Sequence, residues 1–196
     1  MNIMKNLITY ILTTAFAATL MIGFTQTTHA NDTLTTTQTH IKFFSTTPVE
    51  DIESNNFNAT STINTETGEV IFVVPMQSFE FEKSLMQRHF NQKKFLNTRD
   101  FPRARYVATI TNLQEINFTT DGTYTAHVEG EMTIRGETNP LKEQASVIVS
   151  NGTVTVNSIF PITLAEYGIE FSKGKPSRNI AKTVEVTVIA EYQFEQ

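Results

Sequence analysis

The feature that most restricts the fold of this chain is a period-two alternation of apolar and polar side chains in its C-terminal half. In residues 124–134, YTAHVEGEMTI, the even-numbered positions are apolar or glycine, and the odd-numbered positions are polar. The same parity largely recurs in residues 154–164 and 184–194. Successive side chains of a strand point to opposite faces of a sheet, so this pattern predicts antiparallel strands with one buried and one wet face.

Five further segments have strand-like composition: 40–46, 52–63, 69–76, 105–114 and 144–149. The second of them could be broken or bulged around Asn55-Asn56. Turn-forming pairs such as Asp121-Gly122 and Asn151-Gly152 separate several of the strands. Closing such a sheet would remove its exposed strand edges. We therefore predict an all-β fold, an eight-stranded antiparallel lipocalin-like barrel with one amphipathic helical insertion.

The predicted insertion lies in residues 78–102. Here the apolar residues no longer recur at every second position but at the three- to four-residue spacing of a helix. One apolar stripe would contain Phe81, Leu85, Met86, His89 and Phe90. Ser78, just before it, is a suitable N-cap, because its hydroxyl can accept from the free backbone donors of a first turn. A helix here would cover an open end or face of the sheet, and its apolar stripe could act as a lid over a hydrophobic ligand.

The N-terminal residues have the pattern of an export signal. Lys5 precedes an uncharged, mostly apolar run over residues 7–24, and Ala30 ends a plausible cleavage site. We predict a signal peptide over residues 1–30, a flexible leader over 31–39 and one barrel domain over 40–196. Cleavage would leave no integral membrane span, in a periplasmic or secreted protein. An uncleaved anchor is the alternative, since the run approaches the length of a membrane span.

Composition argues against several classes of function. The chain has no Cys, which excludes disulfides, zinc thiolates and thiol catalysis. Its net charge of −5 becomes −6 when Lys5 is removed with the signal peptide, which argues against nucleic acid as a partner. No metal-binding or nucleophile motif surrounds His40, His89 or His127. We predict that the protein is no enzyme and uses no metal and no catalytic cofactor.

An eight-stranded barrel can be filled by its own side chains or can hold one elongated ligand. The strand parity and the helical stripe select candidate lipid-binding residues that would face the interior, namely Phe43, Phe72, Phe81, Leu85, Met86, Phe90, Tyr106, Ile110, Met132, Phe160 and Tyr192. Phe and Met suit an apolar chain, because flat rings and unbranched thioethers adapt to its shape. The same residues could instead simply fill the core.

Three blocks of sequence carry a resemblance to a known family: 79–102, with its Phe101-Pro102 ending, 130–140 (GEMTIRGETNP) and 160–169 (FPITLAEYGI). They resemble the YceI-like family of exported bacterial proteins, and the resemblance extends over about residues 40–196. The first strand, HIKFFST, lacks the usual Asp and His-Ser of that family, which indicates a variant branch. The resemblance implies a lipocalin-like barrel that binds a polyisoprenoid lengthwise, without catalytic residues.

The predicted function is therefore that of an exported carrier, which sequesters a long apolar lipid such as a polyisoprenoid or an isoprenoid-quinone tail. One alternative is an exported barrel with a filled core that acts through its surface in an envelope or stress role. An outer-membrane barrel is disfavoured, because a helical segment interrupts the strands and the polar face lacks aromatic girdles. The sequence is compatible with a homodimer.

Overall fold

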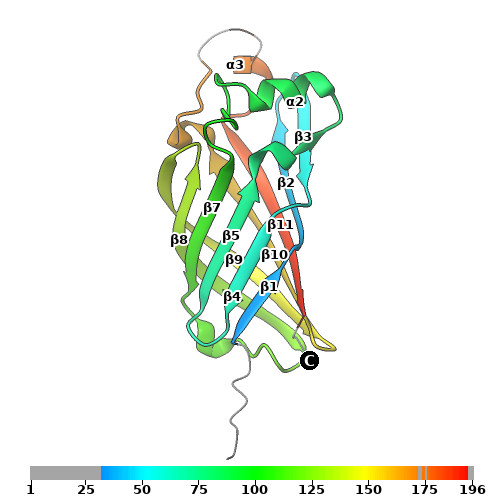
Figure 1. Cartoon of the computed structure of the whole chain (residues 1–196), viewed down its shortest axis with the longest axis vertical. Coiled ribbons are helices and arrows are strands. Elements are labelled where there is room, and N and C mark those ends of the chain that lie inside the picture. Colours follow the sequence, from blue (N-terminus) through cyan, green and yellow to red (C-terminus); the bar gives the residue numbers. More distant parts are fainter. Residues whose placement is uncertain (1–31, 172–173, 175, 194–196) are drawn as a thin grey trace, which may run out of the picture. The chain divides into compact units, whose positions relative to one another are not determined.

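The computed structural model describes residues 32–171, 174 and 176–193, which form one curled antiparallel sheet (Figure 1). The sheet has eleven strands, in the order β1-β4-β5-β7-β8-β9-β10-β11-β2-β3-β6. Their bounds are Thr33–Thr36 (β1), Gln38–Thr46 (β2), Asp51–Asn56 (β3), Thr60–Asn64 (β4), Glu69–Pro75 (β5), Glu80–Phe81 (β6), Arg103–Ile110 (β7), Gly122–Ile134 (β8), Glu137–Ser150 (β9), Thr153–Thr163 (β10) and Thr183–Gln193 (β11).

The helical elements among the described residues are short. They are α2 (Ser84–Asn91), α3 (Pro176–Asn179) and 3-10 turns at Met76–Ser78, Leu113–Glu115 and Leu164–Tyr167. Within the described part of the chain, none is long and apolar enough to cross a membrane. The predicted signal peptide, residues 1–30, lies outside the described residues.

The predicted all-β antiparallel architecture is confirmed, and its regular part follows from the alternation. The β8–β9 hairpin runs from Gly122 opposite Val149 to Ile134 opposite Glu137. Its turn places Arg135 and Gly136 at positive φ, 54° and 86°. Such turns match the twist of paired strands and need residues that tolerate a left-handed backbone, which glycine adopts without steric cost.

The predicted count of eight strands is wrong, because β1 and β6 are additional short strands and because the segment 52–63 is split in two at the break considered around Asn55-Asn56. The Asn56 side chain turns inward, where its Oδ1 accepts from the backbone N–H of Asn58 at 2.9 Å and its Nδ2 donates to the Pro75 carbonyl at 2.9 Å. A side chain that bonds its own backbone two residues on forms a local turn and interrupts the ladder. The predicted leader is also ordered, since β1 and the start of β2 lie in it.

The N-terminal strands β1 and β2 bring the β1 end of the sheet close to β11. Thr36 of β1 lies opposite Ser61, and Ile41 of β2 lies opposite Asn56, so one register continues across the breaks. On its other side, β2 pairs with β11. Thr37 alone separates β1 from β2, so β1, which pairs with β4 at one end of the sheet, also lies beside β11. The sheet therefore curls into a barrel-like shell.

The amphipathic insertion is present, but it begins later than predicted. Ser78 is not its N-cap, since it ends a 3-10 turn, and α2 starts after Lys83 without a side-chain cap. Phe81 lies in β6 rather than in the helix and pairs with Ser54. The Ser54 hydroxyl also donates to the Glu80 carbonyl at 2.8 Å. Pairing with the edge of β3 therefore keeps this segment extended and delays the helix.

The apolar interior consists of two clusters. The first, here called the filled core, packs residues of one half of the sheet, including Leu34, Ile63, Ile110, Val128, Val147 and Tyr192. The second, here called the cavity cluster, includes Ile41, Met76, Phe79, Phe90, Phe160 and Val184. Met132, Leu141 and Val188 pack against both clusters and mark the level where they meet. In Figure 1, α2 and α3 both lie at the upper end of the sheet.

Candidate ligand-binding cavity

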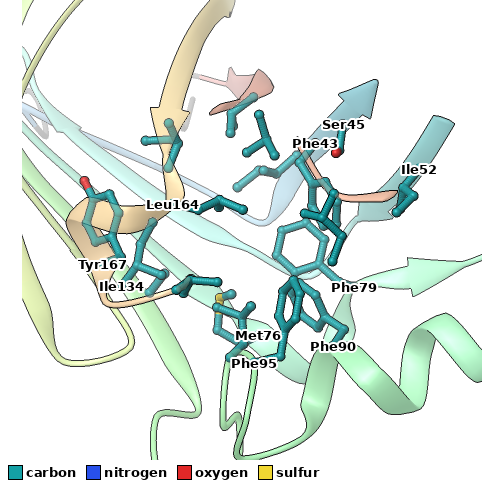
Figure 2. Close-up of a pocket in the computed structure, with 18 of the residues that line it drawn as sticks. Phe43, Ser45, Ile52, Met76, Phe79, Phe90, Phe95, Ile134, Leu164 and Tyr167 are labelled. Atoms are coloured by element: carbon teal, nitrogen blue, oxygen red, sulfur yellow. The ribbon is translucent and has the colours of Figure 1, made fainter. Parts of the chain in front are cut away.

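The cavity cluster surrounds a hollow of about 480 Å³. Inward-facing side chains of β2, β5, β7, β10 and β11 form its wall, and α2 closes one side. Figure 2 shows Phe43, Phe79 and Phe90 gathered on one flank of the hollow, with Ile134, Leu164 and Tyr167 on another. Apolar side chains make up most of the lining. The interior is thus filled at one end and hollow at the other.

Nine of the eleven predicted site residues line this cavity: Phe43, Phe72, Phe81, Leu85, Met86, Phe90, Tyr106, Met132 and Phe160. Ile110 and Tyr192 do not line it. Both are buried in the filled core, with exposures of 4% and 0%, although their strand parity is inward as predicted. Parity reports the face of a residue but not its height along the strand, which explains these two misplacements. Contact of the nine with a lipid stays a prediction.

A group of packed phenylalanine rings joins α2 to the sheet. The Phe90 ring lies 5.5 Å from that of Phe79, 5.1 Å from that of Phe81 and 5.9 Å from that of Phe95, between centroids. Phe95 in turn stacks on Phe171 at 5.0 Å. Offset and edge-on ring pairs of this kind contribute about 0.5–1.5 kcal/mol each beyond the area they bury. The helix is therefore held as a wall of the cavity by its aromatic contacts.

Polar groups gather at the cavity mouth, which we define by Glu50, Lys83, His89 and Asn179. The Lys83 ammonium lies 3.3 Å from the Glu50 carboxylate, and the Asn179 amide donates to the same carboxylate at 2.7 Å. These contacts link α2, α3 and the β2–β3 connection around the opening. His89, which we predicted on the apolar stripe of the helix, is exposed and lies at this mouth.

A second polar group lies at the opposite, closed end of the cavity, which we define by Tyr106, Glu143 and Ser158. Burial raises the pKa of the Glu143 carboxyl, and the hydrogen bond with Ser158 partly offsets this rise. Burial also raises the pKa of the Tyr106 hydroxyl, with further contributions from Glu143 and Glu129. Both groups therefore favour their neutral forms more strongly than they would in water.

Several lining residues were missed by sequence reasoning, including Met76, Phe79, Phe95 and Glu143. Glu143 had a usable signal: in β9, Leu141, Glu143 and Ala145 share inward parity, but the sequence-based strand began only at residue 144. Phe79 and Phe95 lie outside regular strands and helices, so neither strand nor helix spacing could select them.

The described histidines lie outside the cavity or at its mouth. His127 is exposed on the outer face, as predicted. His40 bonds to the Asn55 side chain at 2.7 Å and stacks on Phe57, outside the cavity. Among the described residues, no group of three His, Asp or Glu side chains is arranged to hold a metal ion.

A curled antiparallel sheet that encloses an apolar hollow belongs to the class of barrel-like proteins able to hold one small ligand. Comparison of the sequence with family models matches the YceI-like domain over residues 25–192, so the chain belongs to the YceI-like family. A comparison with curated proteins finds no significant match.

Solved structures show the same fold. A polyisoprenoid-binding domain from Saccharophagus degradans, implicated in plant cell wall breakdown, superposes with a TM-score of 0.70 at 15% identity, covering 84% of this chain and 99% of that domain. BcnA of Burkholderia cenocepacia gives 0.62 at 15% identity, covering 78% and 95%. The YceI protein of Campylobacter jejuni gives 0.55 at 11% identity, covering 71% and 81%. The predicted family is thus confirmed, together with its fold.

Proposed function

We propose that this protein is an exported carrier that sequesters a long apolar lipid, such as a polyisoprenoid or an isoprenoid-quinone tail. The observation that carries this proposal is the apolar hollow of about 480 Å³ beneath α2, in a sheet that is otherwise filled. A polyisoprenoid-binding relative of the same fold supports the choice of ligand class. In this proposal the lipid is cargo, and the protein performs no chemistry and needs no catalytic cofactor.

The energetics of such binding are adequate without many polar contacts. Burying roughly 400 Å² of apolar ligand surface at ~25 cal/mol per Å² gives on the order of 10 kcal/mol, before the costs of association and ordering. The aromatic wall of Phe43, Phe79 and Phe90 offers flat faces to a methyl-bearing chain. Burial and dispersion can thus retain the chain.

Export is the second part of the proposal. The apolar run over residues 7–24 and the small residues before position 31 support removal of a signal peptide after Ala30. The mature protein would then act in the periplasm or outside the cell, where a water-insoluble lipid needs a carrier to move between membranes.

Displacement of the dye ANS from delipidated protein tests the binding function. Linear prenyl alcohols of increasing length are titrated, and affinity should rise by about fourfold for each additional methylene that is buried, until the cavity is full. A homodimer would appear as a doubled mass in light scattering of the same sample. Failure of every chain length to displace the dye, with ANS bound in the cavity, would overturn the proposal.

A further inference from the structure

The closed end of the cavity contains a carboxyl group that the carrier function does not require. The strand neighbours of Glu143 place it at the boundary between the two clusters. Opposite it on β8 lies Val128, and two residues on in β9 lies Ala145, both of the filled core. Ser158 of β10 pairs with Ala145, and the next inward residue, Phe160, belongs to the cavity cluster. Glu143 and Ser158 therefore form the floor of the hollow.

The hydrogen bonds at this floor are satisfied most simply when Glu143 carries its proton. Ser158 Oγ lies 2.5 Å from Glu143 Oε2 and 2.8 Å from the carbonyl oxygen of Gln144. A serine hydroxyl has one proton and can donate to only one of these two acceptors. If Oε2 is protonated and donates to Ser158 Oγ, then Ser158 donates to Gln144 and both contacts are good. The raised pKa of Glu143 agrees with this arrangement.

This arrangement leaves the second carboxyl oxygen, Oε1, as an acceptor. Among the described residues, Oε1 has no hydrogen-bond donor, and it is not one of the fully enclosed atoms. The Glu143 side chain lines the cavity, and Oε1 is the carboxyl oxygen that makes no contact with Ser158. When a ligand fills the hollow and displaces water, a carbonyl-type oxygen left without a donor costs free energy that a hydroxyl of the ligand can recover.

The other groups around the floor do not supply that donor. Tyr106 of β7 is the further titratable group there, and its hydroxyl donates to the Leu141 carbonyl at 3.3 Å. The Glu129 carboxylate of β8 contributes to the raised pKa of Tyr106, but it is paired with the Lys142 ammonium at 2.7 Å. The three polar side chains at the closed end therefore present acceptors, with their own protons already engaged.

We infer that the floor of the cavity receives a hydrogen-bond-donating end of the ligand, a primary or phenolic hydroxyl, which donates to Glu143 Oε1. The ligand would then enter hydroxyl first, with its apolar chain extending past Phe43 and Phe90 toward the mouth. This inference rests on the carrier function proposed above and narrows its ligand class to isoprenoid alcohols or phenols, in preference to ethers and ketones.

Three matched probes test the inference: phytol, its methyl ether and the hydrocarbon phytane. The readout is the ratio of dissociation constants for phytol and the ether, compared between variants, because differences in hydration of the free probes cancel in that comparison. Replacing Glu143 by Leu should shift the ratio against phytol by about three- to tenfold, the worth of one hydrogen bond. Glu143→Gln should keep the wild-type ratio within about twofold, since its amide mimics the protonated acid and preserves Oε1.

Two further variants control for indirect effects. Glu131→Leu, on the exposed face of the neighbouring strand, should leave the ratio unchanged. In Ser158→Ala the carboxyl proton of Glu143 is free to be donated to the ether oxygen, so the discrimination between phytol and the ether should decrease. This variant tests the inference even if Glu143→Leu fails to fold. An unchanged ratio in Glu143→Leu or in Ser158→Ala would overturn the inference while leaving the carrier function intact. If none of the three probes bound the wild-type protein, phytane included, the carrier function itself would fail.

Discussion

The ring of Phe90 on α2 stacks on the ring of Phe43 on β2, with centroids 5.8 Å apart and planes 14° from parallel. Phe43 lies on the inner face of the sheet and Phe90 on the buried side of the helix, so this pair fixes α2 against the barrel wall. The helix is thus a wall of the cavity through a contact between residues far apart in sequence.

Phe90→Asp should therefore weaken lipid retention by at least about tenfold, because it places a charge in the wall and removes several ring contacts. Retained lipid is measured per amount of folded protein, by extraction and mass spectrometry. His127→Ala, on the exposed outer face, is the control and should retain lipid normally. Phe90→Ala gives a milder test if the aspartate variant folds poorly. Equal retention in the Phe90 and His127 variants would mean that α2 does not form the binding wall.

Tyr192→Phe should lower stability without altering lipid affinity. The Tyr192 hydroxyl on β11 lies 2.6 Å from the Ser61 hydroxyl on β4, in a fully buried site between two strands that are not paired with each other. Loss of one partner leaves the other unsatisfied, at a cost of about 1–2 kcal/mol. Urea unfolding measures the change, and adding Ser61→Ala should restore part of it. A large loss of lipid binding in Tyr192→Phe would place this residue back among the ligand contacts.

Gly130→Ala should disrupt the pairing of β7 with β8. A Cβ at position 130 would lie 2.2 Å from the Val107 carbonyl oxygen and 2.4 Å from the Ala108 Cα, both backbone atoms that cannot move aside independently. We expect a loss of at least about 3 kcal/mol in the free energy of unfolding. Gly152→Ala is the matched control: its φ is 78°, but a Cβ there meets nothing within 4 Å, so strain alone should cost about 1 kcal/mol. Comparable losses in the two variants would contradict the close approach at Gly130.

Stability should depend on pH through Glu143. Its pKa is raised in the folded protein, so folding favours the protonated form. The stabilising contribution is then complete below the pKa of the unfolded state and is lost as the pH rises through the folded-state pKa. Melting temperatures of the wild type and Glu143→Gln are measured at about pH 4 and about pH 8. Between the lower and the higher pH, the melting temperature of the wild type should fall relative to that of Glu143→Gln. Equal changes in melting temperature for the two proteins would show that folding does not raise the pKa of Glu143.

Much of the fold could be predicted because it depends on local alternation. Strands β8, β10 and β11 bury long runs of one parity, and these segments were assigned within one or two residues. A break around Asn55-Asn56 was considered from the sequence, but its cause could not be predicted, because it depends on the Asn56 side chain reaching the Pro75 carbonyl, a tertiary contact. The helix start was misplaced for a similar reason, since pairing with β3 holds Phe81 in an extended conformation.

The sequence predicts which face of the sheet lines the site, but not the height along the strands at which the cavity lies. Parity correctly directed Phe43, Met132 and Phe160 into the cavity. It also selected Tyr192, because residues at both heights of a strand share the same face, and only the completed sheet shows which height is hollow. Glu143 was missed because the predicted strand began only at residue 144, whereas β9 begins at Glu137.

Mass spectrometry of the intact, purified protein, followed by organic extraction of whatever it carries, most directly tests whether the cavity holds a lipid. The protein is incubated with a bacterial lipid extract and analysed under non-denaturing conditions. We expect one bound molecule per chain, with an isoprenoid skeleton and a free hydroxyl, and markedly lower occupancy in Phe90→Asp. Protein found only at its unliganded mass, with no apolar molecule in the extract, would contradict the assignment of the cavity to lipid binding.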